Sequence, residues 1–185
     1  RTIGNNNYES RTFKRFLDNS NRENYIFNSK INGIEDSDFI LLVGANPRFE
    51  ATMLNARIRK AYLNNNVKIF STNDVGDLTY PYQSLDGKTQ TIKGIFEGNH
   101  DISKEILKSK NPIIILGESF FRLKSSSFLF FILKKFILKN NKLTDDWNPL
   151  NVLSVDAATV GNFDLDIFNK DKDIINDLKE NKFEL

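Results

Sequence analysis

The residues that most clearly suggest chemistry follow a strand-like run, Phe39–Val43. Directly after it come Gly44-Ala45-Asn46-Pro47 and then Arg48. A glycine at a strand end followed by a helix N-terminus can hold an anion, because free backbone N–H groups and the helix dipole both favour negative charge. The dinucleotide fingerprint has three glycines, however, and this turn has one. The turn therefore does not specify a nucleotide, and any ligand at residues 44–48 stays an open question.

Two further groups of polar residues could do chemistry, and neither forms a site by sequence criteria. Asp145 and Asp146 are adjacent, and adjacent carboxylates usually point apart, so a solvated cap is a better interpretation than an acid/base pair. His100 is the only histidine, and it lies in a polar segment typical of a helix-entry loop. Without a second His or a Cys to share a metal, it is interpreted as a surface residue.

The composition restricts the function classes further. Cys 0 excludes disulfides, thiolate-bound zinc and any cysteine-bound iron–sulfur cluster in this chain. A net charge of +2 gives no electrostatic reason to expect nucleic acid as a partner. Gly-x-Ser-x-Gly and Walker motifs are absent from the sequence. The sequence therefore predicts no catalytic, cofactor-binding or metal-binding residue of its own.

Apolar runs of strand length predict the elements that position these residues. Phe39–Val43 and residues 113–116 are unbroken apolar runs, each followed by a glycine. Such runs are typical of parallel strands that helices cover on both faces. With residues 67–70 as a third strand, the pattern predicts an α/β fold: a Rossmann-like parallel sheet flanked by helices, with an extended N-terminal arm.

The first helix is expected directly after the Gly44 turn, with Asn46 as its cap and Pro47 in its first turn. Arg48, Arg57 and Arg59 cluster around it and are expected to form ion pairs and capping contacts within the chain rather than to bind a ligand. The apolar residues of this helix recur close to the helical period and define its expected buried face: Phe49, Met53, Leu54, Ile58 and Leu63.

Further helices and one long loop are expected beyond it. Residues 72–90 predict the loop, and residues 91–108 two helical pieces broken at Gly98-Asn99, with Asp101 or Ser103 as a cap. Residues 125–139 predict a helix packed on the sheet, with docking of a partner as the alternative; the run is too short and too charged to cross a bilayer. Asn148 and Pro149 predict a last core helix, ending at Gly161 and containing Leu150, Val152, Leu153, Val155 and Ala158.

Three regions are predicted along the chain. Residues 1–32 form a polar, Asn-rich arm, residues 33–168 the Rossmann-like domain, and residues 169–185 a charged tail. Each terminal region contains one candidate turn of helix, around Phe13, Phe16 and Leu17 in the arm and around Ile174, Ile175 and Leu178 in the tail.

Several motifs resemble one known family in the same order along residues 25–166. They are Gly33-Ile34-Glu35, Leu42-Val43-Gly44, Asn46-Pro47-Arg48-Phe49-Glu50-Ala51, Leu54-Asn55-Ala56-Arg57-Ile58-Arg59-Lys60, Asp77-Leu78-Thr79-Tyr80, Leu116-Gly117, Asp146-Trp147-Asn148 and Asn151-Val152-Leu153. The family is the large iron–sulfur subunit (75 kDa subunit) of mitochondrial respiratory complex I, NADH:ubiquinone oxidoreductase. The chain resembles only the C-terminal, molybdopterin-oxidoreductase-like part of that subunit.

The resemblance implies a structural, cofactor-free portion that supports electron transfer from NADH to ubiquinone. It also implies iron–sulfur clusters in a partner portion of the subunit, further partners in the matrix arm, and a location at the matrix side of the mitochondrial inner membrane. Two alternatives stay open: a small nucleotide- or pterin-binding enzyme domain that shares the fold, and a freestanding regulatory binding module.

Overall fold

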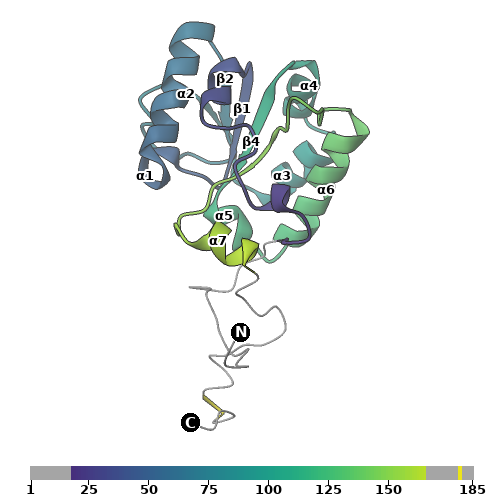
Figure 1. The fold of residues 1–185 in the computed structure, drawn as a ribbon. Helices are drawn as coiled ribbons and strands as arrows, with labels where there is room; N and C mark the ends of the chain where they lie inside the picture. The colour runs from purple at the N-terminus through teal and green to yellow at the C-terminus, as the bar shows by residue number, and fades with distance from the viewer. Residues whose placement is uncertain (1–17, 166–178, 181–185) are drawn as a thin grey trace. The chain divides into compact units, whose positions relative to one another are not determined.

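The computed structural model describes residues 18–165 and 179–180 (Figure 1). Within residues 18–155 the strands form a five-stranded sheet in the order β3-β2-β1-β4-β5. Every pair is parallel, which confirms the predicted Rossmann-like sheet. The strands are β1 (Phe39–Val43), β2 (Lys68–Ser71), β3 (Gln83–Ser84), β4 (Pro112–Leu116) and β5 (Leu150–Val152).

Helices cover both faces of this sheet. In Figure 1, α1 and α2 lie on one side, and α3, α4 and α6 lie on the other. The short helix α7 belongs to a second compact unit, which includes residues 156–185. The bounds are η1 (Arg22–Asn24), η2 (Asn32–Asp36), α1 (Pro47–Glu50), α2 (Thr52–Asn65), α3 (Thr89–Glu97), α4 (Asp101–Lys108), α5 (Glu118–Phe121), α6 (Ser126–Lys139) and α7 (Thr159–Asp164).

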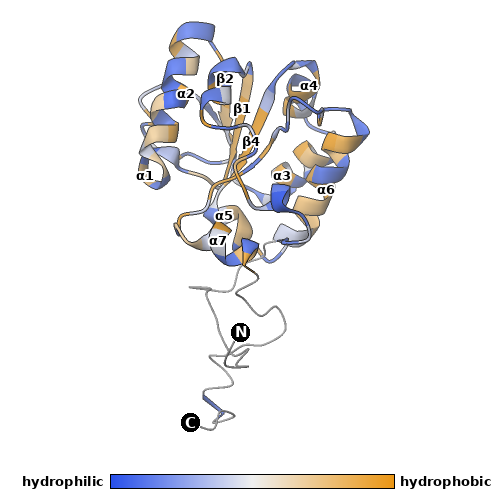
Figure 2. Cartoon of the chain, in the orientation of Figure 1, coloured by the Kyte–Doolittle hydropathy of each residue, from blue (hydrophilic) through white to orange (hydrophobic). Residues whose placement is uncertain are grey.

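The sheet separates two apolar clusters, because successive strand side chains point to opposite faces. Leu41 and Val43 of β1 belong to the cluster that contains the buried residues of α3, α4 and α6. Ile40 and Leu42 belong to the cluster on the α2 side. All five residues of β1 are buried, and so are all five of β4, which explains their unbroken apolar sequences. Figure 2 shows these central strands in the colour of hydrophobic residues.

The first helix differs from the prediction because the chain breaks it at Ala51. Ala51 has φ −155° and ψ 75°, so α1 and α2 are separate helices and no single apolar stripe runs through both. Of the five residues expected on the buried face, only Leu54 and Ile58 are buried. Phe49, Met53 and Leu63 are exposed by 82%, 72% and 66%, which corrects their assignment to the core.

The predicted helix after Pro149 is wrong, because Leu150–Val152 is a strand. Asn148 does cap the turn, since its Oδ1 accepts a hydrogen bond from Leu150 N–H (3.0 Å). The chain then pairs with β4: Ile114 N–H donates to Pro149 O (2.8 Å) and Leu153 N–H to Leu116 O (2.9 Å). A short apolar run fits a strand or a helix equally well, and the free edge of β4 decides between them. Gly161 lies inside α7 and does not end a helix.

A segment from the predicted arm lies against β5. Phe27 forms an antiparallel bridge with Asn151, and Val152 N–H donates to Ile26 O (3.0 Å). Asn151 is fully buried, and its side chain binds Ser29 N–H (2.8 Å) and Ser29 Oγ (2.9 Å). These contacts satisfy the outer edge of β5. The helical turns predicted at residues 13–17 and around residues 174–178 lie outside the described residues.

The break between α3 and α4 is confirmed, but its cap is not the predicted one. His100 is the N-cap of α4, and its Nδ1 accepts a hydrogen bond from Ile102 N–H (3.2 Å). Asp101 binds Lys104 instead, and Ser103 donates to Ile95 O (2.8 Å). The only histidine of the sequence therefore has a local structural role at a helix start.

The start of β4 is held by a carboxylate at the start of β1. Asp38 accepts hydrogen bonds from Ser109 Oγ and from the backbone N–H groups of Lys110 (2.8 Å) and Asn111 (3.0 Å). Burial alone would raise the pKa of Asp38, but these hydrogen bonds to its charged form outweigh burial and lower the pKa. The ionised carboxylate thus stabilises the turn that aligns the two central strands.

We expect Gly117→Ala to destabilise the chain by about 2 kcal/mol or more, because the added Cβ would overlap buried backbone atoms that cannot move away without distorting the turn. A Cβ at this position would lie 2.5 Å from Ala45 Cα. The matched control is Gly94→Ala in α3, where no atom lies within 4 Å of the added carbon; it should stabilise by about 0.5–1 kcal/mol. Urea denaturation of both variants measures the contrast, and equal effects would contradict the packing described.

We expect Asp38→Asn to lower the free energy of unfolding at pH 7 by about 1 kcal/mol. The pKa of Asp38 is lower in the folded chain, so its contribution is complete above the unfolded-state pKa of about 4 and is lost as the pH falls through the folded-state pKa. Denaturation of both proteins between pH 7 and pH 3 is the measurement. A difference that did not shrink at low pH would exclude the charge as its origin.

Candidate functional site

The topology places the candidate site at the carboxyl ends of β1 and β4. In the sheet order, β2 and β3 lie on one side of β1, and β5 lies on the far side of β4. The connections therefore reverse direction between β1 and β4. In open α/β sheets, ligands bind in the crevice at this switch point. The Gly44 turn and the Gly117 turn form its two walls.

These two turns are in direct backbone contact. Gly117 N–H donates to Val43 O (2.9 Å). Gly44 has φ +60°, and a Cβ there would lie 2.6 Å from Phe120 N, within α5. Only glycine therefore fits at either position. At Gly44 both the positive φ and the contact with Phe120 exclude a side chain, and at Gly117 the contact with Ala45 does so. The base of the crevice is consequently filled by the protein's own backbone.

The loop after β2 holds the Gly44 turn from the other side. Thr72 Oγ1 accepts a hydrogen bond from Gly44 N–H (3.3 Å), and Asn46 Nδ2 donates to Val75 O (3.1 Å). Asn46 and Pro47 occupy the predicted cap and first-turn positions of α1, but the Asn46 side chain makes no capping hydrogen bond. Arg48 forms an ion pair with Asp77 (2.6 Å) in the same loop. The residues that resembled an anion site are thus engaged in internal contacts.

Two carboxylates lie beside this contact. Glu118 follows Gly117 and is 5% exposed, with Arg122 Nε 3.8 Å from its Oε1. Burial raises the pKa of Glu50, and the negative charge of Glu118 raises it further, while a hydrogen bond from the Asn46 backbone acts in the opposite direction. Glu50 Oε2 is buried without a hydrogen-bond partner. The electrostatics here disfavour an anion and make a full charge on Glu50 costly.

Neither Glu118 nor Asn55 was predicted from the sequence as a site residue. Glu118 could have been found by comparing the two glycine-terminated strands, since each leads into a short helix. Asn55 is buried in α2, where its Nδ2 donates to Leu78 O (3.0 Å) and its Oδ1 accepts from Tyr80 Oη (2.8 Å). Burial raises the pKa of Tyr80, which keeps the phenol protonated. A polar residue between the buried Leu54 and Ile58 was the available signal.

The other arginines and polar candidates are dispersed. Arg57 and Lys60 both form ion pairs with Glu35. The prediction of internal ion pairs is therefore confirmed for Arg48 and Arg57, whereas Arg59 makes none within residues 18–165 and 179–180. Asp145 and Asp146 are exposed in a turn. Among the described residues, no group of three or more His, Cys, Asp or Glu side chains could hold a metal ion.

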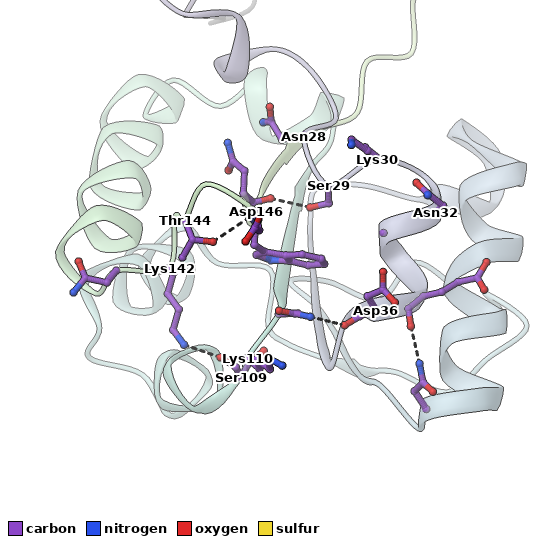
Figure 3. A pocket seen from close by; sticks show the side chains of 17 residues that line it. Asn28, Ser29, Lys30, Asn32, Asp36, Ser109, Lys110, Lys142, Thr144 and Asp146 are labelled. Carbon is purple, nitrogen blue, oxygen red and sulfur yellow. Dashed lines mark hydrogen bonds between the residues drawn. The ribbon is translucent and has the colours of Figure 1, made fainter.

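A polar hollow of about 850 Å³ lies at the opposite, amino-terminal edge of the sheet (Figure 3). Its lysines and carboxylates are balanced, three of each, so it selects no charge. Several of its polar groups bind the chain itself: Asn111 Nδ2 donates to Asp36 O (2.9 Å) and Lys142 Nζ to Ser109 O (2.6 Å). Trp147 Nε1 likewise donates to Pro112 O (2.9 Å). These lining groups therefore serve the fold.

An apolar hollow of about 390 Å³ lies beside α1 and α2, lined in part by Phe27, Ile31, Phe49, Met53 and Leu153. Ile31, Phe49 and Met53 are all more than half exposed. We call these three side chains the α1/α2 patch. In the described part of the chain, no helix has both the length and the apolar character needed to cross a bilayer.

Comparisons with known proteins relate this architecture to one family. The family model of molybdopterin oxidoreductase matches residues 1–185. The chain is 38% identical over 146 residues to the NADH-ubiquinone oxidoreductase 75 kDa subunit of Reclinomonas americana, covering 79% of this chain and 21% of that protein. It is 39% identical over 144 residues to the mitochondrial NADH dehydrogenase [ubiquinone] iron-sulfur protein 1 of Solanum tuberosum, covering 78% and 20%.

A bacterial protein also matches. Over 163 residues the chain is 34% identical to an NADH-quinone oxidoreductase component of Rickettsia bellii, covering 88% of this chain and 24% of that protein. The chain thus spans about a fifth to a quarter of the length of these relatives. The chain belongs to the molybdopterin oxidoreductase family and is homologous to the corresponding region of the large subunit of complex I.

Proposed function

We propose that the chain is a structural, cofactor-free portion of the large iron–sulfur subunit of NADH:ubiquinone oxidoreductase, and that it supports electron transfer in the matrix arm. The observation that carries this proposal is the backbone contact between the Gly44 and Gly117 turns. It occupies the position where a Rossmann-like sheet would otherwise receive a ligand. A domain whose switch point is closed in this way contributes shape and surface rather than chemistry.

The residues at the switch point fit a pterin cofactor poorly. A molybdopterin carries phosphate, and two carboxylates beside the turns, Glu50 and Glu118, would repel it, with Arg122 offsetting part of the charge of Glu118. Arg48, the cation nearest in sequence, is paired with Asp77. No step of a reaction is therefore assigned to this site, and the closed turns and the charge pattern both support the cofactor-free state.

Partners follow from the relatives and from the surface. One relative is named an iron-sulfur protein, whereas this chain has Cys 0, so cluster ligands would be supplied by another portion of the subunit. The α1/α2 patch offers a surface for that portion, since burial of exposed aromatic and aliphatic side chains drives association. The location that goes with this role is the matrix side of the mitochondrial inner membrane.

The competing function is a small nucleotide- or pterin-binding enzyme domain. We expect the chain, purified together with the cluster-bearing polypeptide, to contain far less than one equivalent of pterin or nucleotide after acid release. One equivalent, measured by fluorescence and chromatography, would refute the scaffold role and favour the enzyme.

The α1/α2 patch gives a second test of the scaffold role. We expect Phe49→Ser with Met53→Ser to make the isolated chain more soluble and to reduce its recovery with the cluster-bearing polypeptide at least tenfold. The loss reflects two large side chains that are no longer buried on association, each contributing about 1.5–3 kcal/mol. Leu63→Ser, which changes an exposed leucine outside the patch, is the control. Unchanged recovery of the double variant would exclude the patch as the contact.

We expect Glu50→Gln to raise the free energy of unfolding at pH 7 by up to about 1 kcal/mol, the gain being limited by solvent screening. The pKa of Glu50 is raised in the folded chain, so its carboxyl destabilises the fold increasingly as the pH rises above the unfolded-state pKa of about 4. Denaturation at pH 4 and pH 7 is the measurement, with Glu97→Gln as the exposed control. A variant less stable than the parent at pH 7 would show that the charge is needed.

A further inference from the structure

The outer face of α6 carries a row of exposed apolar side chains. Phe128, Phe131 and Leu138 are exposed by 52%, 66% and 57%. With the exposed Lys135 they follow the spacing i, i+3, i+7, i+10, which puts all four on one stripe of the helix. The opposite side of α6 is buried in the core through Leu129, Leu133 and other residues. The stripe is thus separate from the packing that holds α6 on the sheet.

Positive charge lies within the stripe, at Lys135, and beside it. Three lysines, Lys134, Lys135 and Lys139, lie on α6, which contains no acidic residue. Lys134 is engaged with Asn24 Oδ1 (2.9 Å), whereas Lys135 and Lys139 form no ion pair within the described ranges 18–165 and 179–180. A groove of about 730 Å³ along the helix is lined by these lysines together with Phe131 and Leu138.

A carboxylate, Asp18, also lines this groove, but among the described residues it forms no ion pair with the lysines. Asp18 accepts hydrogen bonds from Ser20 N–H (2.9 Å) and Asn24 Nδ2 (3.0 Å). The groove therefore presents apolar side chains together with Lys135 and Lys139, which form no ion pair with any described residue. These side chains are available to a binding partner. A matching surface combines an apolar stripe with carboxylates on its borders.

We infer that the outer face of α6 docks an amphipathic helix of a partner polypeptide whose flanks are acidic. The 14-residue helix is about 21 Å long, so it offers four turns with the 3,4 spacing of helix–helix seams. Leucine-sized side chains would pack against Phe128, Phe131 and Leu138. Glutamates beside them would reach Lys135 and Lys139.

Two other occupants agree less well with this surface. A second copy of α6 would bring lysine against lysine, since the helix has no acid to pair with them. A membrane surface would have to receive a broad apolar face, but the other side of α6 is already committed to the core. This inference concerns α6 alone and holds whether or not the crevice at the Gly44 turn binds a ligand.

The test uses the full chain and two synthetic helical peptides of about 21 residues, with Leu at positions a and d and either Glu or Lys at positions e and g. Fluorescence anisotropy measures binding. We expect the Glu peptide to bind at least tenfold more tightly than the Lys peptide, and its binding to weaken as salt is raised, because paired surface charges are screened.

Variants then locate the contact. Phe131→Ala with Leu138→Ala should weaken binding of the Glu peptide at least tenfold, and Lys135→Glu with Lys139→Glu should reverse the preference between the two peptides. The controls are Leu63→Ala on α2 and Lys104→Glu on α4, which should change nothing; circular dichroism checks that each variant is folded. Equal binding of both peptides, no binding, or binding only to vesicles of phosphatidylcholine and phosphatidylserine would each overturn the inference.

Discussion

The fold of this chain depends on the close approach of two backbone turns at the carboxyl ends of its central strands. Gly44 and Gly117 lack side chains where the turns touch, and a Cβ at either position would meet backbone atoms at 2.6 Å or less. This contact continues the parallel pairing of β1 with β4, in which all ten residues are buried. At the other end of the same strands, Asp38 fixes the turn that precedes β4. The central pair is thereby held at both ends.

The same constraint shapes what the chain can do. A switch point filled with backbone, next to Glu50 and Glu118, is the ground on which we propose a cofactor-free role. Under that proposal, the exposed surfaces are the main resource for function. Phe49 and Met53 of the α1/α2 patch lie on α1 and α2, which cover the face of the sheet opposite to that covered by α6 (Figure 1). The α1/α2 patch and the outer stripe of α6 differ in charge, since lysines lie only at the second, so they suit different partners.

Much of this architecture could be predicted from the sequence. β1 and β4 were identifiable because burial on both faces requires a continuous apolar run, and in each case a glycine ends the run at strand length. The break at Gly98-Asn99 followed from the glycine, and the position of α6 followed from the most hydrophobic segment of the chain. The errors occurred where local preference is weak: Ala51 gives no sign of a helix break, and Leu150–Val152 is too short for its period to be informative.

The sequence by itself determined the parallel α/β class, the absence of any cysteine ligand and the family resemblance, because these depend on composition, on local period and on motif order. Only the tertiary structure decided that Leu150–Val152 pairs with β4, that Phe49 and Met53 are exposed, and that Glu50 lies near Glu118. These outcomes depend on contacts between residues far apart in the chain. Local free-energy differences between strand and helix, or between buried and exposed, are small enough for such contacts to reverse them.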